Sequence, residues 1–140
     1  MNDKEFWQLI SLINMESVDQ EDCFTGVQNI TAALAEKTPD EIRAFEESIS
    51  QKLYELDSQA RLDQSCGSSD GFLYQRCYMI AKGAENYGKA LKDETLICDD
   101  FSWCENLLYV ARNAWSQSQG SKWDFNASVS YETGANSQKY

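Results

Sequence analysis

Apolar residues recur at intervals of three and four along most of the chain, which is the spacing of amphipathic α-helices. The first series begins at Phe6, after a capping sequence in which Glu5 follows Asn2 by three residues. The pattern predicts an all-α fold, an irregular bundle of five to six helices with a loop-rich C-terminal tail. We expect helices over about 3–14, 19–36, 39–62, 70–82 and 84–92, and a sixth helix capped by Asp99 or Asp100.

The strongest helical signal lies in residues 39–62. Thr38 and Glu41 can form a capping box, and Pro39 stands in the first turn, where a helix tolerates proline. We expect this helix to be the central one, with its apolar stripe buried. The stripe consists of Ile42, Phe45, Ile49, Leu53, Leu56 and Ala60. The opposite, solvated face carries Arg43, Glu46, Glu47, Lys52 and Glu55.

The character of the chain changes at Ser116. Residues 116–140 are rich in Ser, Gln, Asn and Gly, and we find no sustained period among them. Trp123, Phe125 and Tyr131 are the large apolar groups that could pack this part on the domain. We therefore expect one helical domain over residues 1–116 and a polar tail over residues 117–140, either packed on the domain through these rings or partly disordered.

The net charge of −11 is concentrated in the first half of the sequence. Residues 1–70 hold 15 acidic and 5 basic residues, a net charge of −10, whereas residues 71–140 hold 8 and 7, a net charge of −1. A strongly negative surface repels phosphate backbones and attracts basic proteins. We therefore expect no nucleic-acid partner, and we expect the partner to be a basic protein if the charge serves binding at all.

Several kinds of chemistry have no support in the sequence. Histidine is absent, the seven glycines are dispersed, and the five cysteines form no C-x-x-C pair, so we predict neither a cofactor nor a metal site and expect reduced thiols. No apolar run reaches the length of a membrane span. The N-terminal residues MNDKEFWQLI lack the basic and apolar regions of a secretory signal, which favours a cytoplasmic location without a membrane partner.

One polar cluster stands in an apolar context, in the helix expected over 70–82. It consists of Asp70, Tyr74, Arg76 and Tyr78. Arg76 falls on the apolar stripe, where an unpaired charge is costly. Two interpretations remain open: a binding site for an anion or carboxylate, or a buried ion pair with a carboxylate from another helix. The candidate carboxylates are Glu5, Glu47 and Asp70.

The string SSDGFLYQRCYMIAKG at residues 68–83 resembles the signature of DUF4240, a bacterial family of unknown function whose typical string is close to SDDGFDYFRAWLIAQG. The likeness extends over roughly residues 3–115 and weakens in the tail. It implies a compact helical fold and no particular activity. The matching residues are Ser68, Asp70, Gly71, Phe72, Tyr74, Arg76, Ile80, Ala81 and Gly83.

Two functions remain in view. The first, which we favour, is a non-enzymatic protein-interaction module, such as an immunity protein or an adaptor, that binds a basic partner through an acidic face bearing Glu46, Glu47 and Glu55. The second is a domain that binds a small carboxylate or phosphate, or a weak enzyme, centred on Arg76. An open pocket at Arg76 would favour the second function, and an enclosed, fully bonded Arg76 the first.

Overall fold

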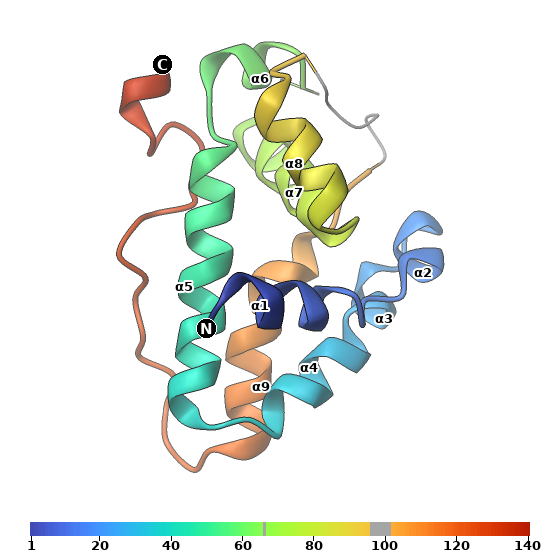
Figure 1. The fold of residues 1–140 in the computed structure, drawn as a ribbon, viewed down its shortest axis with the longest axis vertical. Helices are drawn as coiled ribbons and strands as arrows, with labels where there is room; N and C mark the ends of the chain where they lie inside the picture. The colour runs from blue at the N-terminus through green and yellow to red at the C-terminus, as the bar shows by residue number, and fades with distance from the viewer. Residues whose placement is uncertain (66, 96–101) are drawn as a thin grey trace.

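The computed structural model describes residues 1–65, 67–95 and 102–140, and these residues form helices and connecting segments without a β-strand (Figure 1). The expectation of an all-α fold is confirmed. The elements in chain order are α1 (Asp3–Ile10), α2 (Met15–Asp19), α3 (Cys23–Gly26), α4 (Gln28–Ala35), α5 (Pro39–Glu55), α6 (Gln59–Asp63), α7 (Ser69–Ala81), α8 (Ala84–Lys92), the 3-10 helix η1 (Glu105–Tyr109), α9 (Val110–Ser118) and the 3-10 helix η2 (Ser137–Lys139).

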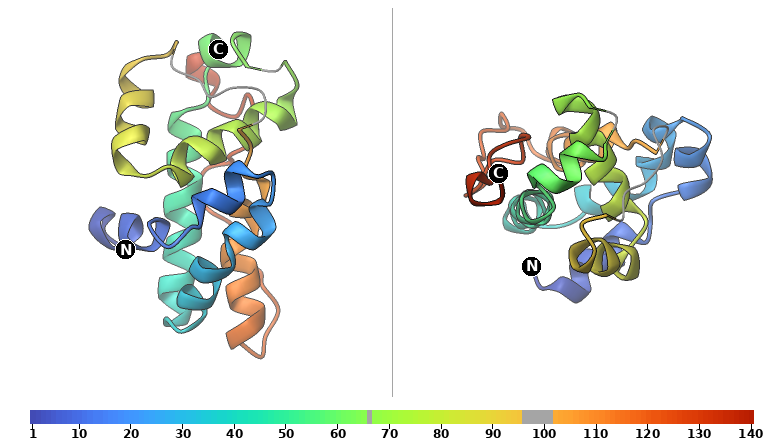
Figure 2. Two further views of the ribbon diagram at one scale, coloured as in Figure 1. Left: turned by 90° about the vertical axis from the view of Figure 1, so that its right-hand side faces the viewer. Right: turned by 90° about the horizontal axis from the view of Figure 1, so that it is seen from above.

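Helix α5 is the longest element and the others gather around it. Its capping box forms as expected, with Thr38 accepting from the Glu41 backbone N–H and Glu41 accepting from the Thr38 backbone N–H. Helices α4 and α9 pack at one end of α5, while α6, α7 and α8 lie at the other (Figures 1 and 2). The predicted burial of Ile42, Phe45, Ile49 and Leu53 is confirmed, because each is at most 1% exposed, whereas Ala60 at the end of the expected stripe is only half-buried.

The helices are shorter and more numerous than the five to six that we expected. The helix expected over 19–36 is divided, because Glu21 takes a left-handed backbone conformation and Asp22 caps α3 by accepting from the Thr25 backbone N–H. The helix expected over 39–62 ends at Glu55, and Ser58 caps a separate helix, α6. Capping side chains thus interrupt the apolar spacing at both places.

The expected cap of the sixth helix, Asp99 or Asp100, lies outside the described residues. Within them, this part of the chain starts as the 3-10 turn η1 and continues as α9. Val110, Ala111, Ala114 and Trp115 are buried, so α9 contributes a full apolar face to the core. None of the described helices is long and apolar enough to cross a membrane.

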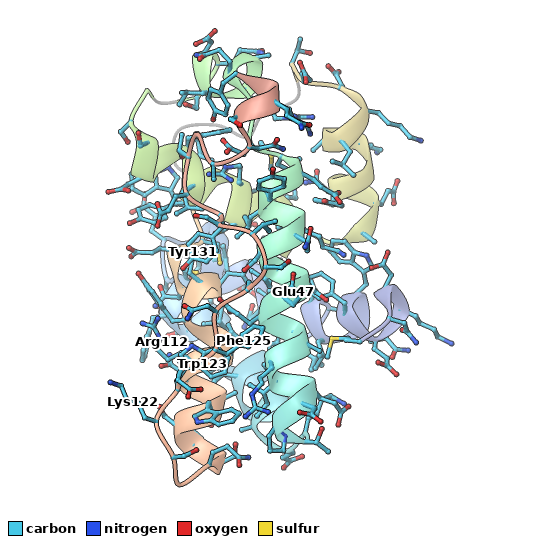
Figure 3. All side chains as sticks on the ribbon, turned by 90° about the vertical axis from the view of Figure 1, so that its left-hand side faces the viewer. Glu47, Arg112, Lys122, Trp123, Phe125 and Tyr131 are labelled. Carbon is cyan, nitrogen blue, oxygen red and sulfur yellow. The ribbon has the colours of Figure 1, made fainter. Side chains whose placement is uncertain are left out.

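The tail runs extended along α5 and α9 and ends beside α6 (Figures 1 and 3). Between residues 123 and 135, half-buried side chains alternate with exposed ones. A repeat of two residues is typical of an extended chain. The expectation of a tail without a period is therefore wrong. The inward positions are Trp123, Phe125, Ala127, Val129, Tyr131, Thr133 and Ala135.

Candidate functional site

Helix α7, which carries the polar cluster, directs its side chains to two different sides of the molecule. Tyr74 and Tyr78 are four residues apart and share one face, whereas Arg76 lies between them in sequence and points about 160° away, as expected at 100° per residue. Asp70 is exposed in the first turn of the helix. The four residues predicted as one binding cluster therefore do not converge on a common point.

Arg76 is enclosed and is bonded to the chain itself. Its guanidinium donates to the Leu53 carbonyl at 2.8 Å, to the Tyr131 carbonyl at 3.0 Å and to the Thr133 hydroxyl at 3.1 Å. Burial lowers the pKa of Arg76, while the nearby Asp57 acts in the opposite direction. In the described part of the chain, none of the expected carboxylates, Glu5, Glu47 and Asp70, forms an ion pair with it.

Asp57, which the sequence analysis did not single out, holds the tail from the other side. Its side chain is fully buried and accepts from the backbone N–H groups of Gly134 and Asn136, each at 3.0 Å, and from the Tyr140 hydroxyl. Asp57 and Arg76 thus bind main-chain groups of the tail. Glu47 also binds the tail, because it accepts from the Ser128 backbone N–H at 2.9 Å. We call Asp57, Arg76 and Glu47 the tail clasp.

The three carboxylates of the expected acidic face lie in different environments. Glu47 belongs to the tail clasp, and Glu55 accepts from the Tyr87 hydroxyl at 2.8 Å. Glu46 is largely buried, which raises its pKa to about 7. On a helix, successive positions are rotated by about 100°, so residues 46, 47 and 55 cannot present one continuous face. The structure does not bring these three residues together.

An acidic, aromatic hollow lies instead beside the tyrosine face of α7. It has a volume of about 520 Å³. Phe24 and Trp103 are 64% and 42% exposed, which is unusual for such large apolar side chains. Three carboxylates and no basic side chain stand among its described lining residues. These residues are Glu21, Asp22, Cys23, Phe24, Trp103, Glu105 and Asn106, and we refer to them as the acidic aromatic hollow.

The two tyrosines of α7 support this hollow from behind. The Tyr74 ring lies 5.5 Å from the Trp103 ring, and the interaction of its hydroxyl with Glu105 raises the pKa of Tyr74. Glu105 also accepts a hydrogen bond from the Tyr109 hydroxyl at 3.5 Å. Tyr78 donates to Asp19 at 2.6 Å and so ties the end of α2 to α7. Both residues therefore position the groups around the hollow and do not line it.

Hydrogen bonds lower the pKa of two groups that line the hollow, Asp22 and Cys23. A hydrogen bond from Thr25 lowers the pKa of Asp22, which keeps this carboxylate ionised. Hydrogen bonds from the Cys104 thiol and from backbone N–H groups of η1 favour the thiolate form of Cys23 and so lower its pKa. Cys23, Cys77 and Cys104 are free thiols. Within the described ranges, no group of three His, Cys, Asp or Glu residues is placed to hold a metal ion.

The sequence held a weak signal for the hollow. Phe24 falls off the helical stripe of its segment, and Trp103 precedes the last apolar series, yet neither residue is unusual in isolation. Their proximity depends on the contact between α3 and η1, which brings together positions about 80 residues apart. Charge was the more informative signal, because two of the three carboxylates come from the acidic first half of the chain.

Comparison with known proteins places the chain in a family without a known role. A family model described as "Protein of unknown function (DUF4240)" matches residues 1–117, from α1 through nearly all of α9. The tail lies beyond this match, so Arg76 of the family signature binds a segment that the family model does not cover. No curated protein and no solved structure matches the chain. With more than half of its length matched, the chain belongs to the DUF4240 family.

Proposed function

We propose that this protein is a non-enzymatic, cytoplasmic interaction module that binds a basic segment of another protein in the acidic aromatic hollow. The observation that carries this proposal is the exposure of Phe24 and Trp103 within a group of three carboxylates. Apolar surface without charge would suit many partners, but apolar surface beside negative charge selects for cationic ones. Immunity proteins and adaptors are the classes of protein that this chemistry fits.

The hollow can accept an arginine or lysine side chain of the partner. The aliphatic stem would pack on Phe24, and the cation would lie over the Trp103 ring, close to Glu105. Because Tyr74 already fixes both Trp103 and Glu105, little conformational freedom is lost at these two residues on binding. The net charge of −11 would also accelerate the encounter with a basic protein.

The alternative function, a small-molecule site centred on Arg76, receives less support. Its guanidinium is fully buried and donates to two carbonyl groups and one hydroxyl of the same chain. An anion could reach it only after the tail had left the surface. A site that must first lose its own hydrogen bonds gains little from new ones.

A matched pair of double variants tests the proposed interaction. Glu21→Gln/Glu105→Gln removes two charges from the hollow, and Glu16→Gln/Glu36→Gln removes two charges from exposed residues outside it. Both variants have the same net charge, so any difference between them reports on location. The probe is a fluorescent peptide of alternating arginine and leucine, with its binding followed by anisotropy at low and at physiological salt.

We expect the hollow variant to bind this peptide at least about tenfold more weakly than the control variant, which corresponds to about 1.4 kcal/mol. Trp103→Ser should weaken binding without changing the net charge. Equal losses in the two double variants would show that the peptide follows total charge alone, and that result would contradict the proposed site.

A further inference from the structure

A second cavity lies on another side of the molecule, between α5, α9 and the tail (Figure 3). Its volume is about 340 Å³, which is within the usual range for small-ligand sites. It shares no described lining residue with the acidic aromatic hollow. The side chains that matter for its chemistry are Glu46, Ser50, Arg112, Trp123, Phe125 and Tyr131.

Glu46 is the unusual group in this cavity. Its carboxylate is largely buried but forms no hydrogen bond or ion pair with any described residue, in contrast to Glu47 beside it, which has three donors. Burial raises the pKa of Glu46 to about 7, and Arg112 partly offsets this effect. A partly buried carboxylate without a donor from the chain is unfavourable, so Glu46 presents a free acceptor to donors that enter the cavity from outside.

Arg112 provides the opposite charge from α9. It is exposed and, among the described residues, forms no hydrogen bond or ion pair. It is close enough to Glu46 to influence the pKa of that residue, yet the two are not within ion-pair distance. A negative and a positive group thus face one cavity without neutralising each other directly.

Aromatic rings of the tail complete the cavity, and the tail clasp holds them in place. Trp123 packs against Trp115 of α9 at 5.4 Å and against Phe125 at 5.8 Å between ring centroids. The carbonyl of Tyr131 is bonded to Arg76, and Ser128 is bonded to Glu47. The wall is therefore formed before any ligand arrives, and its rings can attract a cation through their faces.

We infer that this cavity binds a small zwitterion of amino-acid size, with its ammonium group toward Glu46 and the aromatic rings and its carboxylate toward Arg112. The charges of the cavity match the two ends of such a molecule, and the free carboxylate of Glu46 supplies the acceptor that an ammonium group requires. This site is separate from the proposed basic-partner site, and neither depends on the other.

The test is calorimetric titration of the full-length protein with each of the free amino acids, followed by the best binder's N-acetyl and C-terminal amide derivatives. We expect saturable binding of at least one zwitterion at millimolar concentration. Both derivatives should bind at least about tenfold more weakly, because each lacks one of the two charges. The absence of saturable heat with every amino acid would overturn the inference and leave a cavity filled by water.

Three variants locate the binding. Glu46→Gln and Arg112→Gln should each weaken binding at least about tenfold, whereas Lys122→Gln, at an exposed tail residue outside the described lining, should leave binding unchanged. Both site variants are expected to fold, because Arg112 is exposed and burial disfavours the charge that Glu46→Gln removes. Binding that is unaffected by both site variants would place the ligand elsewhere and contradict the inference.

Discussion

The two faces of α7 use polar residues in opposite ways. On the Arg76 face, a buried guanidinium donates three hydrogen bonds to α5 and to the tail, and only its Nε–H has no partner among the described residues, so the face is closed. On the opposite face, Tyr74 and Tyr78 contact carboxylates and an exposed tryptophan of neighbouring segments, and we call this the open face because the hollow in front of it is open to solvent. The difference shows that residues of one family signature can be structural on one side of a helix and position a surface on the other.

The largest effect should come from breaking the closed face at Arg76. Arg76→Ala leaves the Leu53 and Tyr131 carbonyls without their donor, and we expect it to lower the free energy of unfolding by about 3–5 kcal/mol. Chemical denaturation measures this loss. Release of the tail should also speed trypsin cleavage at Lys122. Arg112→Ala, at an exposed arginine, is the control and should change stability by no more than about 0.5 kcal/mol. A melting temperature equal to that of the wild type would show that Arg76 is not structural.

Asp57→Asn should have the next largest effect and lower the free energy of unfolding by about 2–3 kcal/mol. The substitution removes the negative charge to which the N–H groups of Gly134 and Asn136 donate. The same substitution in the Arg76→Ala background should cost clearly less, since the tail is already released there. A double-mutant cycle measures this coupling. Strictly additive losses would mean that the two residues do not hold the same segment.

Parts of this organisation could be predicted from the sequence, and others could not. The stripe of α5 was predictable because helical spacing is a local property. The breaks at Asp22 and Ser58 carried readable capping signals that the apolar spacing outweighed. The alternation in residues 123–135 was also present, but small and polar side chains between the rings weakened it, and it belongs to an extended segment without a paired strand.

The site residues were harder to predict because their partners are distant in sequence. The polar character of Arg76 indicated that it needed partners, but these are carbonyl groups 23 and 55 residues away, and a main-chain carbonyl leaves no mark in a sequence. Glu46 and Glu47 are adjacent, yet one is unbonded and the other holds the tail. Such differences arise from the tertiary packing of the tail, which helical periodicity does not describe.

Glu46→Gln should have a smaller effect on stability, and it tests whether the carboxylate without a hydrogen bond beneath the tail is less favourable than the bonded ones. Its pKa is raised from 4.5 to about 7 by burial, so the folded protein binds this proton more tightly than the unfolded chain. Protonation of Glu46 therefore contributes to the free energy of unfolding in full below about pH 4.5, and this contribution is lost as the pH rises to about 7. Glu46→Gln should remove the dependence and be more stable than the wild type by about 1–3 kcal/mol near pH 8. Denaturation curves at several pH values measure the difference, and parallel profiles for the two proteins would contradict it.

The smallest effect on stability should come from the open face, at Tyr74. Tyr74→Phe keeps the ring that packs on Trp103 and removes only the hydroxyl that bonds to Glu105. Glu105 lines a hollow that is open to solvent, so water can replace the lost donor, and stability should change by no more than about 1 kcal/mol. Binding of the arginine–leucine peptide should nevertheless weaken by about two- to fivefold, because Glu105 then keeps only the long hydrogen bond from Tyr109 and is ordered further when the cation arrives. Equilibrium denaturation and peptide anisotropy on the same preparation separate the two quantities. A loss of stability comparable to that of Arg76→Ala would mean that this face is also structural, and the contrast between the two sides of α7 would then no longer support a binding surface.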